Sequence, residues 1–279
     1  MRQVPYKTMI TIVFLALGAK ADTIAYVGAS ASAFGTIDLN TGAFTLINGN
    51  SPTVDGFGAL GGSLFASEAF NGVAHGTLFQ INPVTGTHTA VGSDTGLYYE
   101  DFGSTPTGLY AIGHDPTSRL EPQNLYSINP LTGAATLIGP TGLITGQPYQ
   151  ALSTNSATLY FAQGSDLYTL NTNTGAATVV GPFGGFTAMD ALLEEGGILY
   201  GGDNYHHAID TIDPATGTAT VGPPSGVFLD NFGLTYGLAP SPLASSVPEP
   251  ATFGLVGLFV AGIAARRHVL CKRRRAAQL

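Results

Sequence analysis

Short runs of alternating apolar and polar residues recur along most of the chain, and they come in pairs. One phrase appears five times: an alternating run, a polar turn rich in Asn, Asp, Pro, Thr and Gly, and a second alternating run. Its copies lie at 34–47, 78–92, 125–139, 167–181 and 209–222, and their Thr-Gly glycines are Gly42, Gly86, Gly133, Gly175 and Gly217. These glycines are 44, 47, 42 and 42 residues apart, so one structural unit repeats along the chain.

The phrase predicts a β-hairpin. Alternation with a period of two is typical of a strand with one buried face. The proline found in most copies fixes φ at the start of the turn, and the glycine accepts a positive φ at its end. Thr and Val on the return run favour the extended backbone.

Two further strands are expected before each hairpin. The first is centred on 57–60, 102–103, 151–152, 191–192 and 232–236, and the second on Leu-Tyr or Leu-Phe pairs at 64–65, 109–110, 159–160 and 199–200. Residues 24–26 fit the second position in the opening unit. Four strands in roughly 43 residues match a blade of a β-propeller.

The two ends of this repeat region predict how it closes. The opening unit lacks its first strand, while Asn231–Tyr236 has the pattern of a first strand and no unit follows it. Pairing the two ends gives an all-β propeller of five four-stranded blades over residues 22–239, with no exposed edge left at the junction. An open β-solenoid, or six blades with one unrecognised, are the alternatives. The phrase loosely resembles WD40-like and quinoprotein-like repeats, although the chain has no tryptophan.

Charge is distributed unevenly along the 279 residues. All 18 acidic residues lie between Asp22 and Glu249, where Arg119 is the single basic residue, so that stretch carries a formal charge of −17. Such a surface repels phosphate backbones and excludes nucleic-acid binding, whereas cations and cationic partners fit it. The single cysteine, Cys271, excludes an internal disulfide framework.

The N-terminus has the three parts of a signal peptide over residues 1–21. Arg2 and Lys7 are its basic part, Met9–Leu17 is its apolar part, and Ala19–Ala21 is a small-residue cleavage site. A buried first strand or a membrane anchor is the alternative, but nine apolar residues are too few to span a bilayer.

The C-terminus predicts a linker and a membrane helix. Residues 240–250 are rich in Pro and Ser, Ala251–Ala265 is apolar, and basic residues follow from Arg266. Fifteen residues of helix cover about 22 Å, so snorkelling arginines and local bilayer thinning are expected. The basic end belongs on the cytoplasmic side, which leaves the repeat domain outside.

Together these parts resemble a PEP-CTERM sorting signal. The resemblance rests on Val247, Pro248, Glu249 and Pro250, on the glycine-containing apolar run, and on Arg266 and Arg267. It implies an exosortase-type processing enzyme as a partner, cleavage near Pro248–Pro250, and delivery to the surface or matrix of a Gram-negative bacterium that makes exopolysaccharide. The basic tail continues to Leu279 and is longer than usual for this signal. A plain single-pass anchor is the alternative.

Antiparallel order predicts where a site would lie. The Thr-Gly turns share one face of the propeller, and the longer loops between second and third strands share the other, together with the residues that precede each first strand. Those preceding residues form a column that is expected to circle the mouth of the central channel: Asp55, Glu100, Gln147, Thr187 and Asp230. The candidate ligand- or cation-binding residues on that second face are Asp55, Glu100, Asp230, His114, Asp115, Asp203, His206 and His207. Oxygen-rich rings suit Ca²⁺, which is the one cofactor considered. The structural alternative is that these residues cap turns or are solvated.

No catalytic motif is present: the sequence has no G-x-S-x-G, H-E-x-x-H, P-loop or C-x-x-C. We therefore expect a non-enzymatic surface or matrix protein whose propeller binds exopolysaccharide, a cation or a surface protein. The alternative is a secreted polysaccharide hydrolase or lyase, which a cluster of His114, Asp115, Asp203 and His206 would favour. A third hypothesis is a structural module that self-assembles.

Overall fold

A computed structural model describes residues 24–29, 32–52, 54–68, 76–116, 122–144, 150–185, 189–225 and 236–240, and within these ranges all regular structure is β-strand. The strands are β1 (Ile24–Ala29), β2 (Ala33–Asp38), β3 (Phe44–Asn48), β4 (Val54–Leu60), β5 (Ser63–Glu68), β6 (Leu78–Ile81), β7 (His88–Val91), β8 (Tyr98–Thr105), β9 (Gly108–His114), β10 (Pro122–Ile128), β11 (Ala135–Ile144), β12 (Gln150–Thr154), β13 (Tyr160–Gln163), β14 (Asp166–Leu170), β15 (Ala177–Pro182), β16 (Met189–Glu195), β17 (Ile198–Asp203), β18 (Ala208–Ile212), β19 (Ala219–Thr220) and β20 (Tyr236–Pro240). The predicted all-β class is confirmed.

The strands form units of four, as the repeat predicts. Three sheets have four strands each, in the orders β20-β1-β2-β3, β4-β5-β6-β7 and β11-β10-β9-β8. The remaining sheet has eight strands and consists of two such units joined through their first strands, β12 and β16. That junction is short and parallel, with Ser153 opposite Leu192 and Thr154 opposite Leu193.

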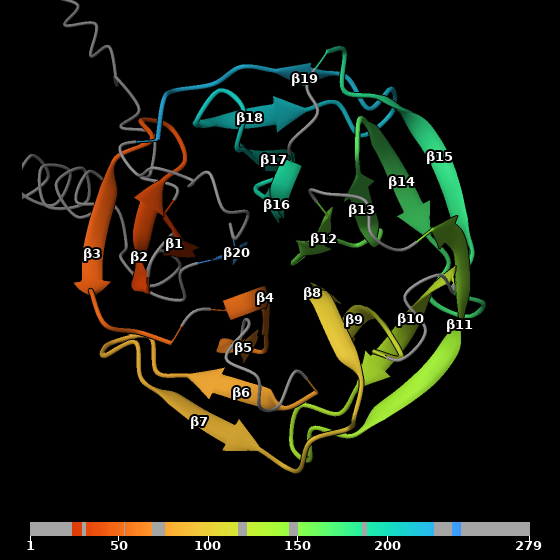
Figure 1. The fold of residues 1–279 in the computed structure, drawn as a ribbon. Helices are drawn as coiled ribbons and strands as arrows, with labels where there is room; N and C mark the ends of the chain where they lie inside the picture. The colour runs from red at the N-terminus through yellow and green to blue at the C-terminus, as the bar shows by residue number, and fades with distance from the viewer. Residues whose placement is uncertain are drawn as a thin grey trace, which may run out of the picture.

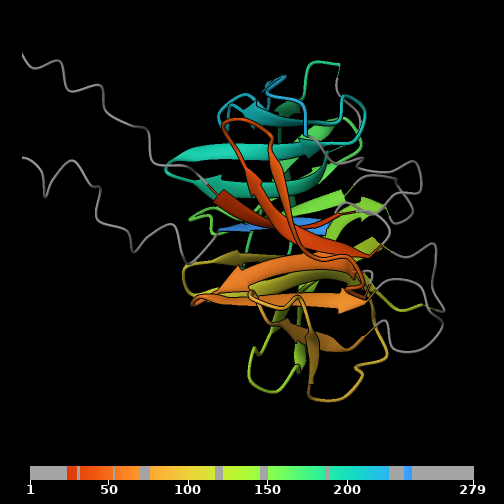
Figure 2. The ribbon, with the colours of Figure 1, turned by 90° about the vertical axis from the view of Figure 1, so that its left-hand side faces the viewer.

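The units are arranged in a ring (Figure 1). The first strand of each unit lies at the centre, and the last strand, such as β7 or β15, lies at the rim. Seen from the side, the strands run between two opposite faces of the ring (Figure 2). First strands therefore all begin at one face and end at the other.

Pairing between β1 and β20 joins the two ends of the domain. It extends from Ala25 opposite Pro240 to Gly28 opposite Tyr236. The expected closure by a C-terminal strand is thus observed. Of the segment expected to form it, Asn231–Tyr236, only Tyr236 lies within the described residues, and it begins β20. Pro240, expected to begin the linker, is instead the last residue of β20, where its missing N–H is tolerated at a strand end.

The five Thr-Gly turns have one conformation. The glycines have φ between 66° and 82°, which confirms the positive φ expected of them. Each donates its backbone N–H to the carbonyl of the Asn or Asp four residues earlier, at 2.7–2.8 Å. The side chain of that same residue also accepts a backbone N–H two residues on, as Asn129 does from Leu131 at 2.9 Å. The turn is therefore specified locally in each repeat.

Apolar side chains fill the space between neighbouring units. Tyr26, Phe34 and Phe57 pack between the first and second units, and the rings of Tyr26 and Phe34 are stacked at 5.8 Å. Similar clusters lie between each later pair of units and between the last unit and the first. Face-to-face packing of sheets in this way buries both faces of each one.

Both predicted chain ends lie outside the described residues, namely the signal peptide (1–21), most of the linker, and the tail at 251–279 with Val247–Pro250, Arg266 and Arg267. No helix in the described ranges is long and apolar enough to cross a membrane.

Candidate binding site at the mouth of the ring

Polar residues occupy the same place near the start of four central strands. They are Asp55 in β4, Glu100 in β8, Gln150 in β12 and Asp190 in β16, and we call this end of the ring the mouth. In β4, β8 and β16 the pairing register shifts at this residue, which marks a β-bulge. Bulges re-aim side chains at the rims of sheets, and here they recur around the mouth.

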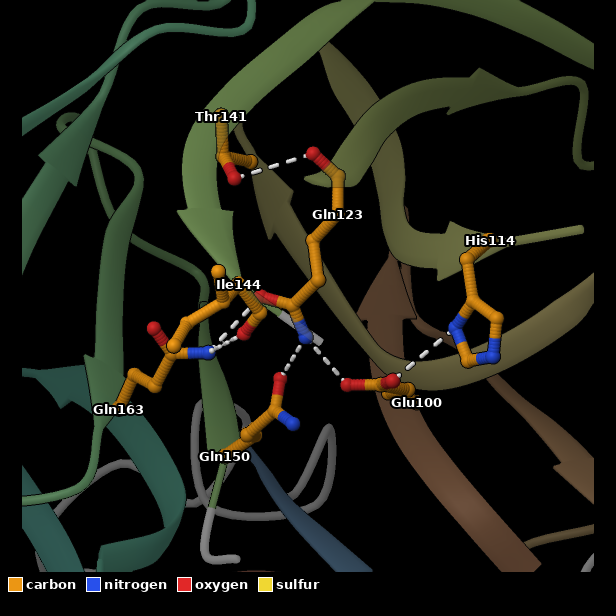
Figure 3. A network of polar contacts seen from close by, with 7 residues as sticks. All are labelled: Glu100, His114, Gln123, Thr141, Ile144, Gln150 and Gln163. Carbon is orange, nitrogen blue, oxygen red and sulfur yellow. Dashed lines mark hydrogen bonds and ion pairs between the residues drawn. The ribbon is translucent and has the colours of Figure 1, made fainter. Parts of the chain in front are cut away.

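Glu100 belongs to a network of polar side chains (Figure 3). One of its carboxylate oxygens is 3.1 Å from Nδ1 of His114, and the other accepts a hydrogen bond from Nε2 of Gln123. The same Nε2 also donates to Oε1 of Gln150. Oε1 of Gln123 accepts from Nε2 of Gln163 at 3.0 Å, so β8, β9, β10, β12 and β13 are joined through one buried amide.

The network is buried, and an aromatic ring packs against one end of it. Gln123 has no exposed surface, and the side chains of Glu100 and His114 are each 11 % exposed. The ring of Tyr98 lies against His114 with its centroid 5.1 Å away. The amide of Gln123 has both its nitrogen and its oxygen hydrogen-bonded, and such a buried group is rigid, which favours a fixed binding surface.

A second group lies on the last unit, where the loop between β17 and β18 approaches Asp190. Nδ2 of Asn204 donates to Oδ2 of Asp190. Asp203 has no exposed surface, and its two oxygens contact the backbone N–H of Tyr205 at 2.7 Å and Nδ1 of His206 at 2.5 Å. The loop is therefore held at several points and leaves Tyr205 69 % exposed.

Asp210 lies beneath this loop. Its Oδ1 accepts the backbone N–H of Gly222 at 3.1 Å, and it has no exposed surface. Burial raises the pKa of Asp210 to about 6, and the neighbouring Asp203 adds to the rise. The negative charge of one carboxyl group disfavours ionisation of the other, so Asp203 and Asp210 resist carrying two charges together.

Asp101, next to Glu100, is buried and bonds to the neighbouring central strands. Its Oδ1 accepts the backbone N–H groups of Phe57 and Phe102 at 3.2 and 2.7 Å, and its Oδ2 accepts that of Leu152 at 2.5 Å. One carboxyl group thus joins β4, β8 and β12. Burial raises the pKa of Asp101, although the three backbone donors act in the opposite direction.

The structure brings the predicted residues into two groups and leaves some apart. Glu100 pairs with His114, and Asp203 with His206, at the predicted face. His207 has φ of 52°, and its carbonyl accepts from Ser225, so it fixes the end of the loop. Asp115 is exposed. Asp55 is placed by its backbone alone, and Asp230 lies outside the described residues.

Two members of the predicted column, Asp55 and Glu100, occupy equivalent positions in their strands, and in two further units another residue holds that position. Gln147 and Thr187 were expected beside Asp55 and Glu100, but Gln150 and Asp190 hold that place, three residues later. The prediction placed each member of the column two residues before an aromatic position of the first strand. In β12 the residue equivalent to Phe57 and Phe102 is a leucine, Leu152.

The sequence analysis did not single out the amides of Gln123 and Gln163, which build the network, or the carboxyl group of Asp101, which joins three central strands. Gln123 and Gln163 come from strands β10 and β13, which meet β8 and β12 only in the ring. Asp101 had one available signal, because it directly precedes Phe102 in the expected first strand of its unit.

Metal ligation gains no support within the described ranges, where no group of three His, Cys, Asp or Glu side chains could hold an ion. The carboxylates Glu100, Asp101, Asp190 and Asp203 are bonded to protein donors instead. The same ranges contain no Lys or Arg, so histidine is the one cationic partner that they can supply.

Comparisons with known proteins find likeness in fold alone. No family model matches the chain, and no curated protein matches it. A crystal structure of a nidogen/laminin complex matches 78 % of this chain and 80 % of its own at 16 % identity, with a TM-score of 0.51. Regucalcin, a calcium-binding protein from Agrobacterium tumefaciens, matches 78 % of this chain and 74 % of its own at 17 % identity, with a TM-score of 0.46. With its ring of four-stranded units, the domain is a β-propeller.

Proposed function

We propose that this chain is an exported protein of the cell surface or extracellular matrix, whose five-bladed propeller binds a ligand at the mouth and catalyses no reaction. An exosortase-type enzyme would process it at Val247–Pro250, ahead of the apolar run and Arg266-Arg267. An exopolysaccharide or a second surface protein would then meet the mouth.

One observation carries the binding role: the polar groups of the mouth are already bonded to one another. Glu100 is held by His114 and Gln123, and Asp190 by Asn204. A nucleophile or general base needs a group that can take a proton from, or attack, a substrate atom. Carboxylates fixed by neighbours instead present a rigid pattern of donors and acceptors, which suits recognition.

The position of the chain ends supports surface display. Ala25 pairs with Pro240 at the face of the Thr-Gly turns, and Gly28 pairs with Tyr236 toward the mouth. Both ends of the domain therefore leave on the side opposite the mouth. A C-terminal membrane tether at that side would leave the mouth open to the medium.

Five blades are supported by the strand pairing and the core. Each four-stranded unit, including the two within the eight-stranded sheet, is followed by an apolar cluster against the next unit. The cluster around Ala25, Leu193 and Tyr200 joins the last unit to the first. A ring closed in this way has no free sheet face at a junction.

A secreted polysaccharide hydrolase or lyase is the second candidate function. The pKa of Asp210, raised to about 6 by burial beside Asp203, is the observation that favours it, because a general acid needs such a value. Against it, Asp203 and Asp210 have no exposed surface. His114 and His206 also bond to carboxylates of different units, rather than forming the single cluster expected of an active site.

Export is tested in a Gram-negative host with and without an exosortase. We expect a shortened chain in the surface or medium fraction when the enzyme is present, and the uncleaved chain in the membrane fraction when it is absent. Glu249→Ala should block shortening, while Ser241→Ala in the same linker should not. Retention of the full-length chain in the cytoplasm of both hosts would contradict the proposal.

Catalysis is tested separately on the purified chain. Release of reducing ends or unsaturated sugars from polysaccharides, lost in Asp210→Asn, would favour the enzyme over the binding protein.

A further inference from the structure

We infer that the mouth binds a neutral sugar unit, which stacks on the ring of Tyr205 and forms hydrogen bonds with an arc of polar side chains from Asn204 to Glu100. This inference rests on the proposed function in one respect, that the mouth is the binding face.

Tyr205 has the exposure and rigidity of a binding platform. The residue is 69 % exposed, and its ring meets the ring of His206 edge-on with a centroid distance of 4.8 Å. Asp203 holds the backbone N–H of Tyr205 and Nδ1 of His206 at 2.7 and 2.5 Å. Because the loop is fixed before binding, little conformational entropy is lost when a ligand covers the ring.

The polar arc is continuous with this platform. Asn204, adjacent to Tyr205, donates to Asp190 on β16. The parallel pairing of β16 with β12 brings the start of β16 beside the start of β12, where Gln150 lies. Gln123 then links Gln150 to Glu100 on β8 (Figure 3). The arc therefore draws on the starts of three central strands, β16, β12 and β8.

The chemistry of the arc selects a neutral ligand. An anionic ligand such as a phosphate or a uronate would meet the carboxyl groups of Glu100 and Asp190, which repel it. Amide and carboxylate groups side by side offer both donors and acceptors, as sugar hydroxyls require.

The aromatic ring supplies the other half of sugar recognition. A pyranose ring has an apolar face of C–H groups beside its hydroxyl edge, and a tyrosine ring buries such a face while its hydroxyl remains hydrated. The pairing of an exposed Tyr205 with a polar arc therefore fits a neutral hexose or an N-acetylhexosamine within a longer chain.

The test is titration calorimetry on the full-length chain in a sugar-free detergent. The probes are cellohexaose, maltohexaose and N-acetylchitohexaose as neutral ligands, hexagalacturonate as an anionic one, and CaCl₂ alone. We expect at least one neutral hexasaccharide to bind. Tyr205→Ala should weaken that binding about tenfold, and Tyr205→Phe, which keeps the ring, should weaken it less.

The control variant is Leu131→Ala, since Leu131 is 87 % exposed in a Thr-Gly turn on the opposite face. Its affinity should equal that of the unmodified chain. Failure of all three neutral probes, preferred binding of hexagalacturonate or CaCl₂, or equal effects of Tyr205→Ala and Leu131→Ala would each overturn the inference. Failure of export would instead contradict the proposed function and leave the calorimetric result standing.

Discussion

A Cβ atom on Gly175 would lie 2.3 Å from the carbonyl oxygen of Gly139. Gly175 ends the Thr-Gly turn of one unit, and Gly139 lies in the outer strand of the unit before it. The contact recurs between Gly217 and Gly181 at 2.4 Å, and between Gly42 and Pro224 at 2.2 Å, where the first unit meets the last. The repeated glycine therefore lets the backbones of neighbouring units touch at four of the five turns, whereas Gly86 lies against the side chains of Asn48 and Phe34.

Three glycine substitutions separate this contact from backbone strain. Gly164→Ala adds a side chain at φ of 60° with nothing within 4 Å, so it should cost about 1 kcal/mol of unfolding free energy. Gly139→Ala meets the carbonyl of Thr174 at 2.3 Å without a positive φ, and about 1–3 kcal/mol is expected. Gly175→Ala combines both effects and should cost most. Urea unfolding measures all three, and equal losses for Gly164→Ala and Gly175→Ala would contradict the contact.

Asp101→Ala should destabilise the domain strongly. It leaves the backbone N–H groups of Phe57, Phe102 and Leu152 without their acceptor in a buried place, at a cost of about 3 kcal/mol or more. Asp115→Ala removes an exposed carboxylate and should change the unfolding free energy by less than about 0.5 kcal/mol. Similar urea midpoints for the two variants would show that Asp101 does not hold the central strands.

Asp210 should make the folded state less stable as the pH rises from about 4 to 6. Its pKa is raised from 3.8 to about 6, so the folded state binds the proton more tightly than the unfolded chain. The stabilising effect is complete below the unfolded pKa and is lost as the pH passes the folded value. Asp210→Asn removes this dependence. The free energies of both proteins, measured by urea unfolding at pH 4, 5, 6 and 7, should converge or cross; parallel curves would contradict the expectation.

His88 should make the folded state less stable as the pH falls, which is the opposite of the effect of Asp210. Burial lowers its pKa from 6.5 to about 4, so the unfolded chain binds more protons in that interval. Stability from this group is fully present above pH 6.5 and is lost as the pH falls toward 4. Nε2 of His88 is 3.1 Å from Oγ of Ser51, and His88→Gln keeps a polar partner there. The variant should retain more of its stability at pH 5 than the unmodified chain does. An unchanged difference between pH 5 and pH 7 would exclude His88 as the titrating group.

Removal of β20 should open the ring. Truncation after residue 235 leaves β1 with an unpaired edge between Ala25 and Gly28, whereas truncation after Pro240 keeps the pairing. We expect the shorter chain to unfold several degrees lower and to associate as its concentration rises, because exposed strand edges pair with one another. Thermal scans and light scattering at two concentrations measure both effects. Identical behaviour of the two truncations would show that closure by β20 contributes nothing.

The sequence by itself determined the four-stranded unit and its turns. Period-two alternation and the Asn/Asp-x-x-Thr-Gly turn are local, since each Asn or Asp bonds to backbone groups two to four residues away. A pattern of that kind can be read along one segment, and for this reason the hairpins and the closing strand were anticipated. An isolated strand such as β20 has no turn to fix its register, so its pairing with β1 is set by the closed ring.

Tertiary structure alone decided which side chains meet. Gln123 contacts Glu100 and Gln150, and Asp101 reaches Phe57 and Leu152, across separations of 23 to 51 residues. Bulges at Glu100 and Asp190 turn these residues toward the mouth, and a one-residue shift of register would send them elsewhere. The alternation and turns in the sequence specify each blade, whereas the closed ring sets the distances between side chains of different blades. The chemistry of the mouth therefore appears only when the ring is closed.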